Sequence, residues 1–509
     1  MFGGVTDLVQ RYADRILGVL SCYDRVIVRG RIHPLDYPSG MESYLRAQGI
    51  RFFDLPKFAM PFREAIRENA ERVAWENSIE VQFIRNHEVR KESIVAKVLE
   101  LRGDKPGLVA ILSAMEVCPS FAARFDKKTG RTSLRADRAK CLHYYFYFID
   151  EDLGLCFMRV PTWCPFGVQA YFNGHNLLAS KLRKAGIEYR MLDNAFTQIS
   201  DWDAAQRLAD ESDTRLVHER LDHYARQFCP AVAMLDLSYQ WNLAQVEYAT
   251  DIVFGRQDDL RPVYETLVRT AVHTVKPAQV ATFLGRKLHS NNTEELGNDF
   301  HTRIQGTRIK HHMGPCSIKM YDKAGIILRI ETTTNDPTWF THYRTVAHRD
   351  GTSSHELAPL KKSIYSLHDL RQLTVAANRR YLDFLSSLDD PTVAMRTVAR
   401  LSEKVEDAGR SYRGFNLFSE EDVRLFETVL RGEHAIAGFR NSDLREHLPA
   451  KSPGQVSRLL KRMWTHGLIK KVGGTYKYYV SELGRIVITA GLKLKNLVLI
   501  PELVRSLPA

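Results

Sequence analysis

Two parts of the chain have a pattern of apolar residues that is typical of β-strands. Residues 143–149 and 155–160 are short apolar runs on either side of Gly154, which is placed to take a positive φ, and this pattern predicts a β-hairpin. Residues 307–332 are also predicted to form strands. Apolar residues recur at helical spacing elsewhere. We expect helices at residues 7–20, 39–84, 168–185, 201–226 and most of 240–300.

The mixture of strands and helices over residues 25–190 predicts an α/β or α+β body. A chain of 509 residues is too long for one ordinary core, so we expect a multidomain protein. The predicted division has four parts. These are a mixed α/β domain at 1–235, a helical region at 236–406 with a basic β-hairpin at 307–332, a polar linker at 407–414, and a C-terminal domain at 415–509.

The C-terminal domain has the clearest local signals. Ser419 begins one predicted helix, Ser452-Pro453 begins another, and Gly473-Gly474 joins two strand-like runs. Three helices followed by a Gly-tipped hairpin, with the motif Ser-x-Leu-Leu-Lys-Arg-Met-Trp-x-x-Gly-Leu-Ile-Lys-Lys at residues 457–471, resemble the winged helix-turn-helix domain of MarR-type regulators. The resemblance implies that this domain binds nucleic acid.

Basic residues in the C-terminal domain support this expectation, because residues 451–481 contain no Asp or Glu. A basic helix beside a basic wing suits contact with the phosphates around a groove. The alternative is a solvated surface on a domain that contacts other proteins. The predicted nucleic-acid-binding residues here are Arg458, Lys461, Arg462, Lys470, Lys471 and Lys477.

The second concentration of basic residues lies in the middle of the chain. Residues 317–331 predict a hairpin in which Gly325 takes the left-handed conformation and Lys319 faces Arg329. We expect Lys310, Lys319 and Arg329 to bind nucleic acid. Glu331 shares the predicted polar face and is a candidate metal ligand; the alternative is that it only neutralises a neighbouring cation.

Lys-Met-Tyr-Asp-Lys followed by Leu-Arg-Ile-Glu resembles part of the nicking domain of rolling-circle replication initiator proteins. This resemblance implies that Tyr321 is a catalytic nucleophile and that Glu331 is a catalytic residue that holds Mg or Mn. One departure is clear: His311 and His312 are adjacent, so in a strand they point to opposite faces and do not form the His-hydrophobic-His metal motif of nickases.

Composition and other motifs narrow the function classes. Lys and Arg total 72 against 60 Asp and Glu, which gives a net charge of +12 and favours an anionic partner. The seven Cys are scattered without a C-x-x-C pair, so we expect reduced thiols. No apolar run of eighteen residues and no signal peptide is visible, which favours a cytoplasmic protein without a membrane partner. The P-loop and dinucleotide-binding motifs are absent.

Together these features predict a nucleic-acid-binding protein, with DNA favoured over RNA, that belongs to a mobile or replicating element. Two alternatives stay open. One is a metal-dependent nickase or endonuclease built on the 307–332 hairpin. The other is a non-enzymatic transcriptional regulator whose body senses a ligand or forms a homodimer.

Overall fold

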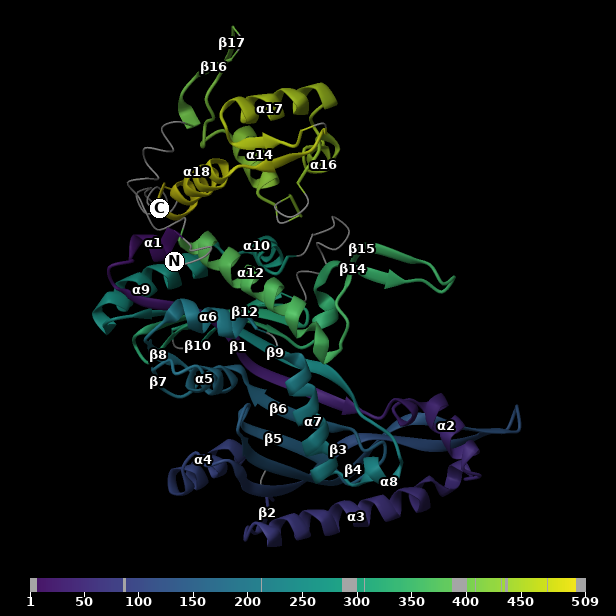
Figure 1. Cartoon of the computed structure of the whole chain (residues 1–509). Coiled ribbons are helices and arrows are strands. Elements are labelled where there is room, and N and C mark those ends of the chain that lie inside the picture. Colours follow the sequence, from purple (N-terminus) through teal and green to yellow (C-terminus); the bar gives the residue numbers. More distant parts are fainter. Residues whose placement is uncertain are drawn as a thin grey trace, which may run out of the picture. The chain divides into compact units, whose positions relative to one another are not determined.

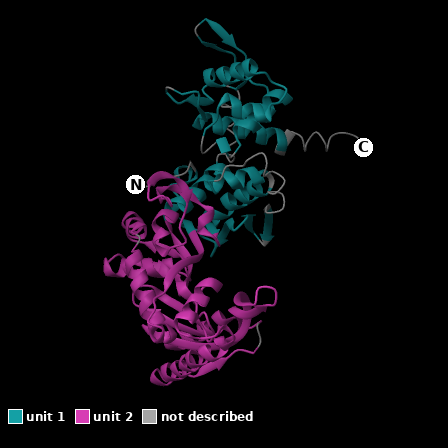
Figure 2. Ribbon diagram, turned by 90° about the vertical axis from the view of Figure 1, so that its right-hand side faces the viewer, with its two compact units in different colours: residues 1–20, 249–333, 372–509 teal, residues 21–248, 334–371 magenta. Residues whose placement is uncertain are grey.

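The computed structural model describes residues 7–85, 88–211, 213–285, 300–305, 307–386, 401–407, 409–431, 433–434, 438–473 and 475–499. The chain has a mixed α/β architecture built on one large mixed sheet, which confirms the fold class predicted for the body. It divides into two compact units (Figure 2). Unit 1 comprises Met1–Leu20, Ala249–Thr333 and Gln372–Ala509, and unit 2 comprises Ser21–Tyr248 and Thr334–Arg371.

The sheet of unit 2 is mixed, with strand order β1–β6–β5–β4–β3–β2. Its short edge strand β2 pairs parallel to β3, whereas the other neighbours pair antiparallel. Gly154 has a φ of 68° and joins β4 to β5, which confirms the predicted hairpin. The strands are β1 (Ile16–Arg31), β2 (Val81–Phe83), β3 (Gly107–Asp126), β4 (Arg131–Asp150), β5 (Gly154–Pro161) and β6 (Val168–Asn173).

Helices and small hairpins complete unit 2 (Figure 1). Two-stranded sheets are formed by β7 (Tyr189–Met191) with β8 (Phe196–Ile199) and by β14 (Thr341–Ala347) with β15 (Ser353–Pro359). The α-helices are α2 (Pro38–Ala47), α3 (Leu55–Glu76), α4 (Lys91–Arg102), α5 (Gly174–Lys184), α6 (Trp202–Asp210), α7 (Thr214–Phe228) and α8 (Ala231–Met234). The single-turn 3-10 helices are η1 (His33–Leu35), η2 (Phe52–Asp54), η4 (Pro337–Trp339) and η5 (Ile364–Ser366).

The sheet of unit 1 has the strand order β10–β11–β12–β13–β9–β1, and β1 and β9 also contribute residues to unit 2. Its central strand β13 is buried along its whole length, as expected for a strand between two others. The strands not yet given are β9 (Gln240–Phe254), β10 (Phe300–Gln305), β11 (Arg308–Met313), β12 (Cys316–Lys323) and β13 (Ile327–Thr334).

One face of this sheet is covered by α12 (Leu367–Ser386). Asn378 of α12 bonds to Thr332 and Thr250, and Tyr381 of α12 lies 3.2 Å from the imidazole of His311. Phe283 packs edge-on against Tyr381, which brings a second helix to the same side. The other body helices of unit 1 are α1 (Asp7–Arg11), α9 (Gln257–Thr274) and α10 (Pro277–Phe283).

The C-terminal part of unit 1 has a core of its own. A cluster of buried apolar side chains draws its members only from residues 401–488, with Phe426, Phe439 and Met463 among the least exposed. The elements are β16 (Val405–Asp407), β17 (Arg410–Tyr412), α14 (Glu420–Val429), α16 (Asn441–His447), α17 (Pro453–Thr465), β18 (Ile469–Lys471), β19 (Tyr478–Val480), α18 (Glu482–Lys493) and the π-helix η6 (Leu494–Leu499). The domain boundaries predicted at residues 235 and 407–414 are statements about which parts fold independently, and they stay predictions.

Four predicted helices are wrong in part. Residues 16–20 belong to β1, residues 81–83 form β2, residues 168–173 form β6, and residues 240–254 form β9. Each segment pairs with strands distant in sequence, and this long-range pairing outweighs local helical spacing.

All seven cysteines are free and buried, as expected for reduced thiols. Among the residues that the structure describes, no helix combines the length and the apolar character needed to cross a membrane.

Candidate nucleic-acid interface

Three cations form a row across neighbouring strands of the unit 1 sheet. Arg303 of β10 is paired with Lys310 of β11, and Lys310 is paired with Lys319 of β12. Paired residues of antiparallel strands point to the same face, so the three side chains lie side by side. Three basic residues at neighbouring positions concentrate positive charge on this part of the sheet, which favours an anionic partner.

This row lies on the face that α12 does not cover. His311 of β11 is buried against Tyr381 of α12, and its neighbours Lys310 and His312 therefore point to the opposite side. We call this side, with Arg303, Lys310 and Lys319, the cationic sheet face. The sequence-based expectation that His311 and His312 point to opposite faces is confirmed.

The pKa of His312 reflects the positive potential of the cationic sheet face. The rings of His301 and His312 stack with centroids 4.1 Å apart and an angle of 14° between their planes. Burial, followed by the charges of Lys310 and other basic neighbours, lowers the pKa of His312 to about 4. The ring is therefore neutral near pH 7, and protonation would add another charge to a face that already repels it.

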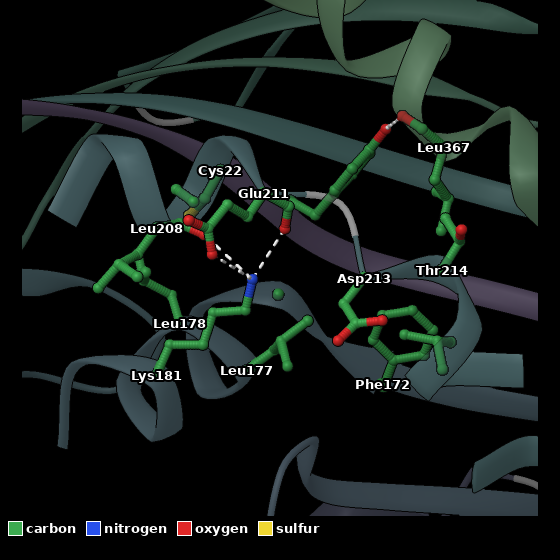
Figure 3. Close-up of a pocket in the computed structure, with 14 residues that line it drawn as sticks. Cys22, Phe172, Leu177, Leu178, Lys181, Leu208, Glu211, Asp213, Thr214 and Leu367 are labelled. Carbon is green, nitrogen blue, oxygen red and sulfur yellow. Dashed lines mark hydrogen bonds and ion pairs between the residues drawn. The ribbon is translucent and has the colours of Figure 1, made fainter. Parts of the chain in front are cut away.

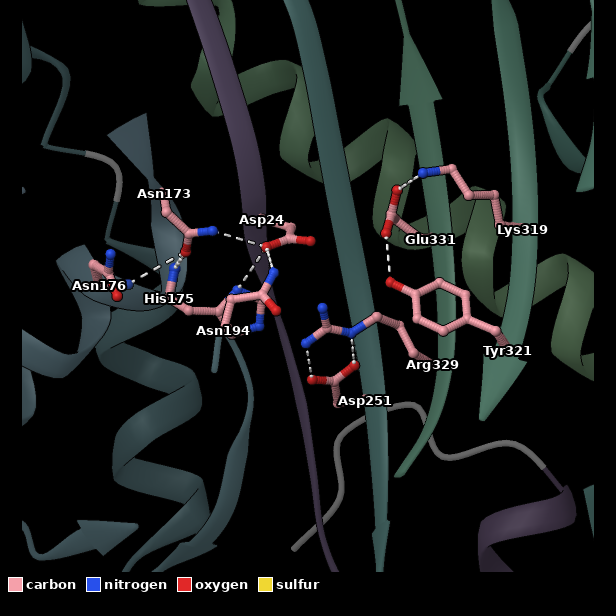
Figure 4. A network of polar contacts seen from close by, with 10 residues as sticks. All are labelled: Asp24, Asn173, His175, Asn176, Asn194, Asp251, Lys319, Tyr321, Arg329 and Glu331. Atoms are coloured by element: carbon pink, nitrogen blue, oxygen red, sulfur yellow. Dashed lines mark hydrogen bonds and ion pairs between the residues drawn. The ribbon is translucent and has the colours of Figure 1, made fainter. Parts of the chain in front are cut away.

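Tyr321 and Glu331, the predicted catalytic pair, do come together (Figure 4). The hydroxyl of Tyr321 donates to Oε2 of Glu331 at 3.0 Å, and the ammonium of Lys319 donates to Oε1. Glu331 is 1% exposed, so it neutralises Lys319 in a buried position and not on a solvated surface. A divalent cation on Glu331 would compete with both donors, and the catalytic and metal roles of this pair stay predictions.

The turn that precedes Glu331 differs from the predicted one. Ala324 has a φ of 58° and Gly325 a φ of 76°, so two consecutive residues adopt the left-handed conformation. The expected turn required this only of Gly325. The Oδ1 atom of Asp322 accepts a hydrogen bond from the Gly325 amide at 2.9 Å, which fixes the turn locally.

Arg329 has a structural role, which corrects its predicted contact with nucleic acid. Its side chain is fully buried, and two of its nitrogens donate to the two oxygens of Asp251 in β9 at 2.6 and 2.7 Å (Figure 4). Lys319 and Arg329 each have a carboxylate partner and do not form the unbalanced pair that the sequence predicted. A buried guanidinium with a bidentate partner holds strands together.

Arg462 requires the same correction. It is 6% exposed, its guanidinium bonds to Asp422 at 2.8 and 3.0 Å, and its carbon Cζ lies 3.7 Å from the centroid of the Phe415 ring. It also donates to backbone carbonyls in the segment predicted to be a linker, at Arg413 and Gly414. Asp422, the acid that neutralises Arg462, lies outside residues 451–481, the segment that contains no Asp or Glu.

The remaining predicted cations of the C-terminal part are accessible. Lys461 is partly neutralised, because its ammonium lies 2.8 Å from Asp407, and Lys477 is half-buried with its ammonium 6.0 Å from the Tyr479 ring. The other three are Arg458, Lys470 and Lys471, which are exposed. In the described part of the chain, no carboxylate forms an ion pair with them.

Unit 2 contains a large cavity that the sequence did not predict. Its volume is about 660 Å³, and its lining includes four arginines and one lysine but only one acid, Asp36. Gln169 of β6 is paired with Arg29 of β1 on one side and with Arg159 of β5 on the other. The cavity is therefore built on the face of a sheet, and its lining is strongly cationic.

The cations of the cavity differ in how far they are neutralised. Arg31 bonds to Asp36, Arg159 lies 2.8 Å from Glu116, and Lys362 lies 3.3 Å from Asp336. Arg29 and Arg138 form no ion pair with a carboxylate among the residues described, so they are available to an anionic ligand. Arg29 and Arg31 stand at alternate positions of a strand, which is the one sequence signal that could have indicated this site.

A second, smaller pocket of unit 2 is no comparable site (Figure 3). Its volume is about 50 Å³, enough for only a few water molecules, and its walls include Leu177 and Leu178. The ammonium of Lys181 is satisfied by the backbone carbonyls of Leu208 and Glu211 at 3.1 and 2.8 Å.

No family model, no curated protein and no solved structure matches this chain. Function must therefore be argued from the geometry of these sites.

Proposed function

We propose that this protein binds nucleic acid, with DNA as the favoured partner, through the cationic sheet face of unit 1. The observation that carries the proposal is the cross-strand row of Arg303, Lys310 and Lys319. A polyanion that follows the row would meet the positive charges of Arg303 and Lys310, whereas Lys319 already has the carboxylate of Glu331 as its partner. Release of the counterions condensed on the nucleic acid then supplies the free energy of binding.

The face also offers a place for bases. The stacked pair of His301 and His312 lies beside the row, and the ring of His312 is neutral near pH 7, so these rings are suited to stack on unpaired bases. Tyr321 stands two residues from Lys319 on the same side of β12. A cationic track with adjacent rings favours a single-stranded segment of the nucleic acid here.

A winged-helix function is proposed for the C-terminal part. The order α14, α16, α17 and the β18–β19 hairpin supports it, as do the accessible cations Arg458, Lys470 and Lys471. Arg458 lies on α17, the helix that would enter the groove, and the two lysines lie on the hairpin that would form the wing. Such cations position a duplex mainly through phosphates.

The sheet proposal is tested with the variant Arg303→Gln/Lys310→Gln. We expect weaker binding of single-stranded DNA and a smaller salt dependence, with the slope of log affinity against log salt reduced by about 0.7 for each phosphate that the variant no longer neutralises. Fluorescence anisotropy over a salt series measures both quantities. The matched control, Lys97→Gln/Lys128→Gln, removes two exposed lysines of unit 2 and should behave like the parent. Equal affinity and slope in all three proteins would refute the proposal.

A second function, that of a ligand-sensing regulator, is favoured by the cavity of unit 2. A concave site of this volume, with arginines that no described carboxylate neutralises, suits a phosphorylated or carboxylated small molecule.

For this second function we expect Arg29→Gln/Arg138→Gln to abolish the rise in melting temperature that an anionic ligand produces in the parent. A thermal-shift screen with inorganic phosphate, nucleotides and dicarboxylates provides the measurement. Nucleic-acid binding by the sheet should persist in this variant. If no anion stabilises the parent more than the variant, the cavity is not a ligand site.

The nickase alternative rests on Tyr321 and Glu331 with Mg or Mn. Their contact supports a shared role, but the hydrogen bond that the Tyr321 hydroxyl donates to Glu331 fixes the position of this hydroxyl. We therefore favour nucleic-acid binding over cleavage as the function.

A further inference from the structure

Three side chains with metal-binding atoms converge in the C-terminal part of unit 1. Glu433 and His434 lie after the end of α14, and His447 is the last residue of α16. Oε1 of Glu433 is 2.9 Å from Nε2 of His447 and 3.8 Å from Nε2 of His434. A set of ligand atoms, one from each residue, lies within 4.8 Å of one another.

His434 supplies a second, independent observation. The residue is 3% exposed, and its Nε2 atom has no hydrogen-bond partner among the described residues. A buried polar nitrogen without a partner is costly, and such nitrogens in folded proteins are nearly always satisfied. The atom lies 3.8 Å from Oε1 of Glu433, and the ring packs near Phe439, with ring centroids 5.2 Å apart.

The distances fit a tetrahedral ion. Bonds of about 2.0–2.1 Å from Zn²⁺ to nitrogen and oxygen place neighbouring ligand atoms about 3.3 Å apart. The two measured separations, 2.9 and 3.8 Å, lie on either side of this value. All three ligand atoms lie within 4.8 Å of one another, so side-chain rotations would bring them around one ion.

We propose that Glu433, His434 and His447 form a binding site for a divalent transition metal of the Zn²⁺ class, with water as the fourth ligand. Two imidazoles and one carboxylate favour such an ion over Mg²⁺, which prefers oxygen ligands. The ion would join the segment after α14 to the end of α16. It would satisfy the orphaned nitrogen of His434 and stabilise the C-terminal part of the chain.

One neighbouring cation competes with the metal. Nε of Arg431 donates to the same Oε1 atom of Glu433 at 2.9 Å. Binding of the ion requires this guanidinium to move to the second carboxylate oxygen or into solvent. Arg431→Gln is therefore expected to bind the metal more tightly than the parent does.

The test uses the full chain without a polyhistidine tag, stripped of metal and titrated with Co²⁺ and then Zn²⁺. We expect His447→Gln to bind one equivalent less than the parent and to lose the visible absorption of tetrahedral Co²⁺. The matched control is His466→Gln, which removes a histidine of the same region whose ring nitrogens face backbone carbonyls of Arg462 and Glu403. The control should keep the full stoichiometry, and Zn²⁺ should raise the melting temperature of parent and control but not of His447→Gln.

The same stoichiometry and spectrum in parent and His447→Gln would overturn the proposal. If His447→Gln does not fold, the parent and Arg431→Gln decide the matter. X-ray absorption of the Zn²⁺-loaded parent must then show imidazole ligands, and Arg431→Gln must bind Co²⁺ at least as tightly as the parent. Absence of imidazole ligands, or weaker binding by Arg431→Gln, would equally refute the site.

Discussion

Arg329→Met is expected to destabilise unit 1 by about 3–5 kcal/mol, the typical cost of removing one partner of a buried ion pair. The guanidinium is fully buried and bonds to both oxygens of Asp251, which is itself 2% exposed. Methionine keeps much of the volume but leaves the Asp251 carboxylate without this partner in an environment that solvates it poorly. Urea-induced unfolding of the full chain measures the loss.

A double variant separates the charge from the packing. Arg329→Met/Asp251→Leu removes both charges and should recover much of the lost stability, because well-packed apolar residues often replace a buried pair at little cost. If the double variant is no more stable than Arg329→Met, the buried carboxylate is not the cause. Nucleic-acid affinity should change little in a double variant that folds, since Arg329 lies away from the surface.

Arg462→Met and Arg458→Met, two substitutions one turn apart on α17, are expected to have opposite consequences. Arg462→Met should cost about 3–5 kcal/mol, because it leaves Asp422 buried at 1% exposure without its guanidinium. Arg458 is exposed and forms no ion pair with a described carboxylate. Arg458→Met should therefore change stability by no more than about 0.5 kcal/mol but weaken binding to duplex DNA.

Unfolding curves and anisotropy titrations on the same two preparations check this contrast. A stable Arg462→Met protein would show that the buried pair is dispensable. Undiminished DNA binding by Arg458→Met would show that α17 does not face the nucleic acid.

Local patterns predicted the parts of the fold that local interactions form. The β4–β5 hairpin was predicted because Gly154 tolerates a positive φ between two apolar runs, and α17 because Ser452 caps it and its apolar stripe faces a core. The strands β1, β6 and β9 were missed where their residues have helical spacing. Their partners lie far along the chain, and a single sequence does not show which segments pair.

The candidate sites divide in the same way. The sequence placed Tyr321 near Glu331 correctly, since both belong to one hairpin. It did not show that Arg329 and Arg462 are buried, because their partners Asp251 and Asp422 are 78 and 40 residues away. The cavity of unit 2 escaped notice for this reason too, as its arginines come from separate strands.

The discontinuous make-up of unit 1 has a consequence for synthesis on the ribosome. Its first segment ends at Leu20, but the last segment begins only at Gln372, so roughly 350 residues must be translated between them. At about 5–20 residues per second, the first segment waits on the order of tens of seconds for its partners. The core at 401–488 joins residues close in sequence and can form as soon as it emerges. Nascent chains should therefore depend on chaperones until α12 has been made, and early release should yield aggregation-prone fragments.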